Sequence, residues 1–346
     1  MAMAAWFIPK PAVGPHPPAE SLIPLTSGQC LQSHEVGGKA ARLASLARAG
    51  FPVPAGFVVS EEVFRVFCRM NRLDDRLWRL APREAAQAVL GAVMPESLRE
   101  RIVAAARHLG ADPLAVRSSA LAEDRADRSM AGQFDTFLHV SPDDVPDRVR
   151  ACWASLFHAA PRAYRLRMDS GEDGRMGVIV QRQVDARCSG VVFTIDPVSR
   201  SADDFVIEWV RGLGDRLVSG QVTPERRHVR RDHLQAPEDV RPEVADVIAR
   251  VCRWARKAEQ HFRQPIDMEW AADARNIYVL QARPVTALTT GRTAVWTNVN
   301  LAENFPQPLT PLAWSLVRRF YGAYMQAILR YFGWRTGDLD RAGEVL

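Results

Sequence analysis

The sequence predicts an α+β fold, and three segments support this prediction. Residues 267–284 indicate a β-hairpin, with two runs of alternating apolar and polar side chains around a turn at 273–276. Residues 177–184 and 189–197 indicate two apolar strands joined by four residues. Residues 37–50 indicate a helix that begins at Gly37-Gly38-Lys39 and stops at Gly50, just before Pro52.

The hairpin is predicted to have one apolar face and one polar face. Centring its turn on Arg275 pairs position 269 with 281, 267 with 283, 268 with 282 and 270 with 280. Side chains alternate between the faces of a strand, which predicts two sets. The apolar set is Met268, Trp270, Tyr278, Leu280 and Ala282, and the polar set is Asp267, Glu269, Gln281 and Arg283.

The polar face has the side chains that a metal-bound nucleotide needs. Opposed residues have Cβ atoms about 5 Å apart, so Glu269 and Gln281 are placed to share a hard cation, which prefers oxygen ligands. Arg283 lies beside them, where it meets Asp267 or a phosphate oxygen in a bidentate contact. The alternative is a surface hairpin whose outer face is simply polar.

Two further segments suggest contacts to phosphate. Two glycines at a helix start let backbone N–H groups approach an anion, and Lys39 adds a charge there. The segment is not a Walker A loop, and its alternative reading is an ordinary turn. Arg117 ends an apolar strand and precedes a loop of small residues, which suits phosphate binding. Its alternative is an ion pair with Glu123 or Asp124.

Five motifs in a fixed order then resemble one known family. They are GGK…PVP.GFVVS, LAVRSSA.AED…AGQ.DTFL, VIVQR.V…SGVVFT.DP, IE..RGLGD.LVSG.VTP and DMEW…YVLQARPVT. Together they resemble the nucleotide-binding domain of the phosphoenolpyruvate synthase, pyruvate phosphate dikinase and rifampicin phosphotransferase family. The resemblance runs from about Val36 to Thr286, and five ordered motifs are far more specific than any one of them.

The resemblance implies an ATP-grasp fold, in which two α+β lobes clamp ATP between antiparallel sheets, with ATP and Mg²⁺ as cofactors. It implies that Lys39, Arg117 and Arg283 are catalytic and contact the phosphates. The other implied nucleotide contacts are Gly132, Gln133 and Thr136 near the phosphates, Gln181, Gln183 and Val184 along the adenine edge, and Glu208 at the ribose. Glu269 and Gln281 would carry the magnesium ion.

The resemblance also implies a partner. In this family ATP phosphorylates a histidine on a swivelling domain while ATP yields AMP and phosphate. None of the eight histidines of this chain lies in the family's Thr-Ser-His context. We therefore expect the phosphohistidine domain on a separate chain or on a missing remainder of the protein. Two alternatives stay open: a catalytically idle ATP-binding domain, and an ATP-grasp ligase that forms an acyl phosphate.

The predicted organisation has four parts. Residues 1–35 are expected to be a flexible, proline-rich leader, 36–180 the N-terminal lobe and 181–288 the C-terminal lobe with the metal-binding hairpin. Residues 289–346 are expected to be a linker and the start of a truncated following domain. A helix capped by Thr310 would carry many aromatic side chains there. We expect these side chains to pack against a partner surface.

Composition predicts a soluble, cytoplasmic protein. The five cysteines are scattered without CxxC spacing, which argues against a disulfide framework or a zinc site. No apolar run approaches the roughly 20 residues of a membrane span. The net charge of +5 is mild, and no stripe of basic and aromatic residues indicates nucleic-acid binding.

Overall fold

The computed structural model describes residues 21–110, 113–120, 136–157, 176–197, 199, 201–214, 222–237, 239–285, 315 and 319. The chain divides into two units, Met1–Leu288 and Thr289–Leu346. The fold below is that of the first unit. The predicted aromatic helix from Thr310 lies almost wholly outside the described residues, as do Gly132 and Gln133 of the predicted phosphate site.

The first five-stranded sheet is antiparallel and has the strand order β1-β2-β5-β3-β4. Its strands are β1 (Leu22–Pro24), β2 (Gly56–Val59), β5 (Met176–Arg182), β3 (Leu114–Ala120) and β4 (Thr136–Val140). The inner strands β3 and β5 are buried on both faces, which explains why their sequences are apolar runs and not alternating ones.

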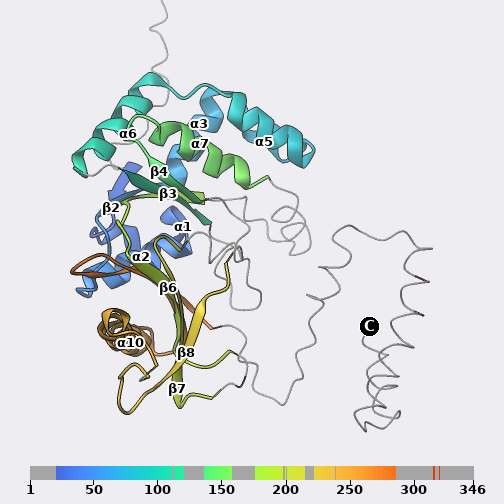
Figure 1. The fold of residues 1–346 in the computed structure, drawn as a ribbon. Helices are drawn as coiled ribbons and strands as arrows, with labels where there is room; N and C mark the ends of the chain where they lie inside the picture. Colours follow the sequence, from blue (N-terminus) through green and yellow to red (C-terminus); the bar gives the residue numbers. More distant parts are fainter. Residues whose placement is uncertain are drawn as a thin grey trace, which may run out of the picture. The chain divides into compact units, whose positions relative to one another are not determined.

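Helices cover one face of this first sheet (Figure 1). They are α3 (Glu61–Met70), α5 (Pro82–Gly91), α6 (Glu96–His108) and α7 (Val145–Ser155), with the short α4 (Asp74–Leu77) after α3. Val116 and Val180 of the sheet pack with Phe67 and Trp153 of the helices in one core. The other face of the sheet packs against α2 (Gly38–Arg48) and α1 (Ser33–Val36).

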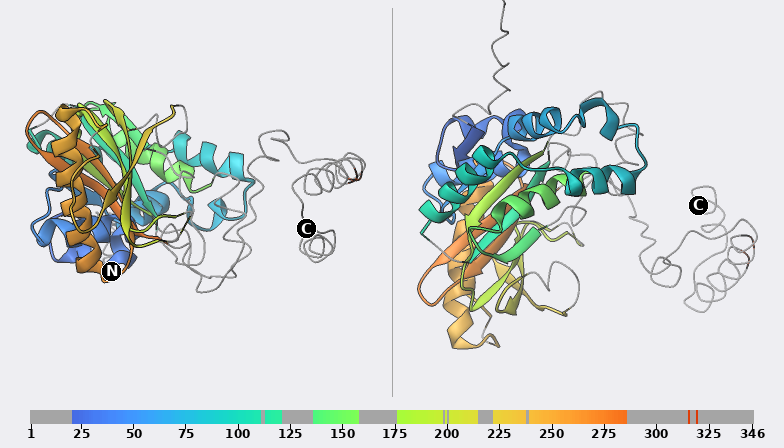
Figure 2. Two further views of the ribbon diagram at one scale, coloured as in Figure 1. Left: turned by 60° about the horizontal axis from the view of Figure 1, so that its bottom comes forward. Right: turned by 90° about the horizontal axis from the view of Figure 1, so that it is seen from above.

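The second five-stranded sheet is also antiparallel, with the order β10-β9-β6-β7-β8. Its strands are β10 (Ile277–Pro284), β9 (Ile266–Ala272), β6 (Cys188–Phe193), β7 (Asp204–Arg211) and β8 (Glu225–Arg230). The long helix α10 (Pro242–Phe262) lies along one face of it in both views of Figure 2. Its residues Ile248, Cys252 and Ala255 share a core with Ile207 and Met268 of the strands.

Helix α2 joins the two cores. Leu43 packs with Ile179 of the first sheet, whereas Leu46, one turn further along, packs in the core of the second sheet. The segment that follows α2 also contacts the hairpin, because Val279 N donates to the Pro52 carbonyl at 2.9 Å. Two antiparallel sheets, each with its own helices, confirm the predicted α+β fold with two lobes.

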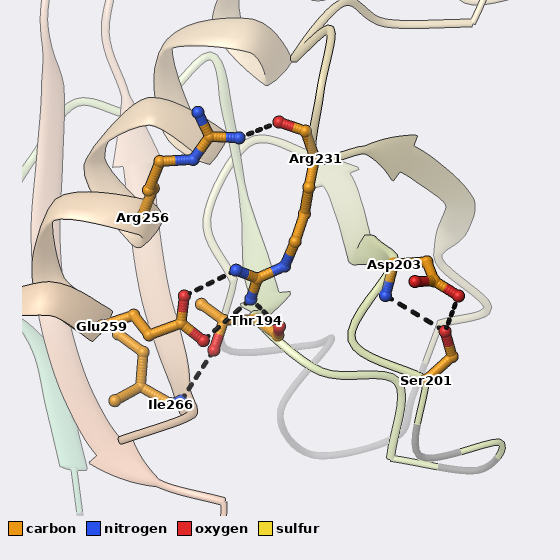
Figure 3. Close-up of polar contacts among 7 residues, drawn as sticks. All are labelled: Thr194, Ser201, Asp203, Arg231, Arg256, Glu259 and Ile266. Atoms are coloured by element: carbon orange, nitrogen blue, oxygen red, sulfur yellow. Dashed lines mark hydrogen bonds and ion pairs between the residues drawn. The ribbon is translucent and has the colours of Figure 1, made fainter. Parts of the chain in front are cut away.

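A cluster of polar contacts lies at one end of the second sheet, beside α10 (Figure 3). Arg231, just after β8, donates through both Nη atoms to the Glu259 carboxylate of α10, at 2.8 Å each, and also to the Thr194 carbonyl. Thr194 Oγ1 in turn accepts from Ile266 N at 2.9 Å, where β9 begins. Arg256 donates to the Arg231 carbonyl. These contacts tie α10 to one end of the sheet, where β6 and β8 end and β9 begins.

The described elements differ from the predicted boundaries at two places. Residues 21–35, assigned to the leader, contain β1 and η2 (Gln29–Leu31), and Ile23 and Cys30 are buried. A strand of three residues is too short to show a periodic pattern. The first lobe also extends past residue 180, because β5 runs to Arg182 and the second sheet begins with β6 at Cys188.

The hairpin forms with three of its four predicted pairs. Glu269 faces Gln281, Met268 faces Ala282 and Asp267 faces Arg283, as the turn arithmetic predicts. The predicted pairing of 270 with 280 is wrong, since Trp270 faces Val279 across a register shift between Val279 and Gln281.

A β-bulge at Leu280 explains the error. One extra residue in β10 reverses the alternation of faces on the turn side of the bulge. Ile277 and Val279 therefore enter the core with Trp270. Tyr278 and Leu280, predicted on the apolar face, stay outside that core, and Tyr278 Oη donates to Asp273 Oδ2 at 3.0 Å instead.

Candidate functional site

One row of side chains crosses the whole second sheet. In register, it contains Gln281, Glu269, Val191, Glu208 and Arg226, one residue from each strand. Directly paired residues point to the same face of a sheet. The alternate residues, among them Met268 and Ile207, pack toward α10. The row therefore places two carboxylates, an amide and a guanidinium on the face away from that helix.

The next row contains an ion pair. Arg283 Nε donates to both carboxylate oxygens of Asp267, at 2.9 and 2.6 Å. Asp267 is only 7% exposed, and this burial raises its pKa to about 6, although the Arg283 charge opposes the shift. Arg42 of α2 lies close enough for its charge to act on the same carboxylate. The sequence analysis did not identify Arg42.

Arg117 connects the two sheets. From β3 of the first sheet, its Nη1 donates to the Leu280 carbonyl at 3.0 Å, and its Nη2 lies 3.6 Å from Glu269 Oε2. The bulge supplies this acceptor, because the extra residue leaves the regular ladder of the hairpin. Glu123 and Asp124, the alternative partners, lie outside the described residues. Arg117 and Glu269, two residues of the predicted site, are thus in contact.

The start of α2 packs directly on β3. Ala40 N donates to Ser119 Oγ at 2.9 Å. Gly37 has φ +82°, and a Cβ there would lie 1.9 Å from the Ser119 carbonyl oxygen. Only glycine allows this approach, which explains the glycine at position 37. Ser119 and Arg117 share a face of β3, two residues and about 7 Å apart, so Lys39 and Arg117 come from neighbouring parts of the fold.

Thr136 belongs to the same region. It is the direct partner of Arg117 in the pairing of β3 with β4, and it is exposed. The structure therefore brings Arg117 of the first lobe into contact with Glu269 of the second, and Thr136 and the start of α2 lie next to Arg117 on the first lobe.

The residues predicted along the adenine edge lie where the chain passes from β5 to β6. Gln181 is 2% exposed, and its Nε2 donates to the Pro54 carbonyl at 3.1 Å. Its side chain thus packs inside the first lobe. Gln183 and Val184 follow β5, in the connection to the second sheet, and the Val184 carbonyl accepts from Ala186 N at 2.9 Å.

Arg226 lies in the cross-strand row and was not predicted from the sequence. Its Nε lies 3.7 Å from Glu208 Oε1 and its Nη2 lies 3.8 Å from Asp196 Oδ1. The segment around it contains Arg226, Arg227, Arg230 and Arg231. Only the pairing of Arg226 with Glu208 distinguishes it from the other three.

The donor set fits a magnesium ion that also binds phosphate. Within the described residues, no group of three or more His, Cys, Asp or Glu side chains could hold a metal. Magnesium in nucleotide sites commonly takes one or two protein oxygens and fills its other positions with phosphates and water. A carboxylate at Glu269 opposite an amide at Gln281 supplies that number and type of ligand.

The helices among the described residues include none long and apolar enough to cross a membrane.

Comparison with known proteins agrees with this arrangement. The family described as "Pyruvate phosphate dikinase, AMP/ATP-binding domain" matches residues 33–247 and 237–299. Similar relatives include a phosphoenolpyruvate synthase of Aeropyrum pernix, 36% identical over 72% of this chain and 40% of its own length. A rifampicin phosphotransferase of a Streptomyces species is 35% identical over 73% of this chain and 34% of its own. The prodigiosin synthesizing transferase PigC of Serratia marcescens is 35% identical over 77% and 33%.

This chain thus spans 33–40% of the length of these three relatives. The family match covers most of the described fold, including the cross-strand row and every strand except β1, which precedes residue 33. The chain therefore belongs to the family of pyruvate phosphate dikinase AMP/ATP-binding domains, for which the sequence analysis predicted the ATP-grasp fold.

Proposed function

We propose that this chain is the ATP-binding module of a phosphotransferase that phosphorylates a histidine on a swivelling domain. The observation that supports it most is the contact of Arg117 with Glu269 and the Leu280 carbonyl. A guanidinium from one sheet thereby lies beside the predicted metal ligands of the other. Charged groups gathered between two sheets suit a ligand that carries several negative charges and a cation.

The strand β3 sets the direction in which the nucleotide would lie. Pro113, just before β3, accepts from Gln183 N at 3.2 Å, and Ser119 near its other end accepts from Ala40 N. Six residues of strand span about 20 Å. The connection proposed to hold adenine and the helix start proposed to hold phosphates are therefore at opposite ends of one strand, with Arg117 between them.

Each proposed residue has a definite task. Lys39 and Arg117 would neutralise phosphate oxygens at the start of α2, and Arg283, oriented by Asp267, would hold the transferred group. Glu208 would face the ribose. Glu269 and Gln281 would hold Mg²⁺, which polarises the phosphoryl oxygens when bound. Gly132 and Gln133 are proposed to contact the phosphates, as the family resemblance implies.

The acceptor is proposed to be a histidine carried by another chain or by a further part of this protein, with ATP converted to AMP and phosphate. The three relatives are named for different products and acceptors. A shared nucleotide module that phosphorylates an intermediate histidine would serve all of them. The final acceptor would then be chosen elsewhere.

The test is to mix the purified chain with a separately expressed histidine domain from a full-length relative, together with Mg-ATP. We expect acid-labile phosphate on that histidine and AMP formed in step. ATP binding without any phosphorylation would identify an idle binding domain. An ADP product trapped as hydroxamate with a carboxylate substrate would identify the ligase alternative.

A further inference from the structure

One residue of β4, His139, contacts the connection between the two sheets through the side chain of Gln183. Gln183 N donates to the Pro113 carbonyl at 3.2 Å. Its side-chain Oε1 accepts from His139 N at 2.6 Å, and its Nε2 lies 3.3 Å from His139 Nδ1. Both ends of the Gln183 amide therefore contact His139. The backbone N–H and the side-chain amide of Gln183 therefore both have partners. Its backbone carbonyl is the one polar group of this residue that these contacts do not use.

His139 reaches Gln183 from an unusual backbone position. It has φ +56°, a conformation that is uncommon outside glycine, although asparagine, aspartate and histidine adopt it more often than other residues. The pairing of β3 with β4 explains it. Leu114 faces Val140 and Val116 faces Phe137, so β4 has one residue more than β3 between these pairs. His139 lies in this bulge, and the bulge re-aims its N–H and its ring.

A strained bulge that points at one amide suggests a functional constraint. Glycine would fit the conformation without strain but could not contact Gln183 Nε2. The bulge is anchored on either side, because Val140 is buried and Phe137 packs partly against the core of the first lobe. His139 is therefore held rigidly against the connection, and no other described side chain contacts the Gln183 amide in this way.

We propose that His139 is a positioning residue for the base of the nucleotide. It fixes the connection at 183–187 through the Gln183 amide, so that the backbone of this connection is presented to the base. This proposal rests on the proposed function, because it takes the 183–187 connection to be the adenine end of the site. Gln183 then acts as an anchor through its side chain, and His139 contacts no part of the ligand.

The proposal predicts that base binding and phosphate binding respond differently to substitution. His139→Gly removes the ring and relieves the backbone conformation. We expect it to weaken ATP binding about five- to tenfold, the effect of losing one hydrogen bond of the contact. Binding of inorganic tripolyphosphate, which has no base, should not change, since Lys39 and Arg117 lie at the other end of β3.

Two further variants separate positioning from simple stability. His139→Asn keeps a side-chain acceptor and tolerates positive φ, so its ATP affinity should stay within about twofold of the parent protein. Arg72→Gly is the matched control, because Arg72 also has φ +56° but lies at the end of α3. It should stabilise the fold as much as His139→Gly does, with no change in ATP affinity.

The experiment is calorimetric titration of each variant with Mg-ATP and with magnesium tripolyphosphate, alongside thermal unfolding without ligand. The proposal is supported if His139→Gly unfolds at or above the parent temperature yet loses ATP affinity alone. It is overturned if this variant binds ATP as the parent does, or if both affinities fall together. A parent protein that binds tripolyphosphate but not ATP would overturn the proposed function itself.

Discussion

Asp267 and Glu269 are two residues apart on one face of β9, yet their burial and their partners differ. Asp267 is buried, and both of its oxygens accept from the single N–H of Arg283 Nε, whereas Glu269 is more accessible and lies 3.6 Å from Arg117. A carboxylate whose two oxygens already accept from a guanidinium is a poor metal ligand. This difference supports the proposal that Asp267 orients Arg283 and that Glu269, not Asp267, would hold the cation.

The buried carboxylate should make stability depend on pH. Its folded pKa of about 6 lies above the ordinary value of 3.8. The folded state therefore holds its proton more tightly, and this residue costs stability as pH rises from about 4 to about 6. Asp267→Asn should gain stability relative to the parent over that window, by on the order of 2–3 kcal/mol, and the difference should be constant above it. Urea unfolding at several pH values measures this, and parallel curves would contradict it.

Glu269 gives a prediction about metal dependence. Glu269→Ala should weaken binding of Mg-ATP much more than binding of metal-free ATP, because an anionic ligand of the cation is lost. Calorimetric titration with and without magnesium tests this. Asp246→Ala on α10 is a suitable control, since that carboxylate lies on the helix covering the other face of the sheet. Equal losses with and without magnesium would show that Glu269 does not bind the metal.

Arg117 gives a prediction about geometry. Arg117→Ala should lower ATP affinity or phosphoryl transfer by roughly 2–4 kcal/mol, the scale of losing one preorganised charged donor. Arg117→Lys should recover little, because a point charge cannot contact the Leu280 carbonyl, Glu269 and a phosphate with separate donors. Arg253→Ala on α10 controls for net charge. Near-parental ATP binding by Arg117→Ala would leave this residue a structural role only.

At the scale of elements, the candidate site depends on two irregular backbone segments, the start of α2 and the β-bulge in β10. Only the first of them can be predicted from the sequence. The Gly37-Gly38 pair indicates a special backbone at the start of α2, and the structure gives its reason in the contact with Ser119. The bulge at Leu280 has no such signal. Ile277, Tyr278, Val279 and Leu280 are all apolar, so either register buries large side chains, and only packing against α10 decides between them.

The α2 junction gives a prediction with a matched control. Gly37 and Gly50 have nearly the same positive φ, +82° and +81°, but a Cβ at Gly50 meets nothing within 4 Å. Gly50→Ala should therefore cost only the conformational term of about 1 kcal/mol. Gly37→Ala should cost clearly more and also weaken ATP binding, because α2 must move away from β3. Chemical unfolding of both variants measures the difference, and equal costs would mean that the contact with Ser119 adapts freely.

At the scale of the whole molecule, local patterns predicted the elements, and only the ordered set of motifs predicted how they combine. Periodicity alone indicates a hairpin, a helix and a strand pair. It does not show that β3 and β5 are neighbours, since their pairs join residues far apart in the chain, such as Arg117 and Ile179 at 62 positions. Arg226 was missed because it lies just after the motif that ends at Pro224, and only the pairing of β7 with β8 sets it beside Glu208.

The whole-molecule arrangement gives the last prediction, which concerns residues 289–346. Every proposed ligand lies between Lys39 and Arg283, and both sheets are complete by Pro284. The first compact unit ends at Leu288. A chain ending at Leu288 should therefore bind Mg-ATP within about twofold of the full chain, a difference of about 0.4 kcal/mol. Titration of both chains under one set of conditions, with a fold check by circular dichroism, measures this. A well-folded shortened chain that has lost ATP affinity would show that residues beyond 288 contribute to the nucleotide site.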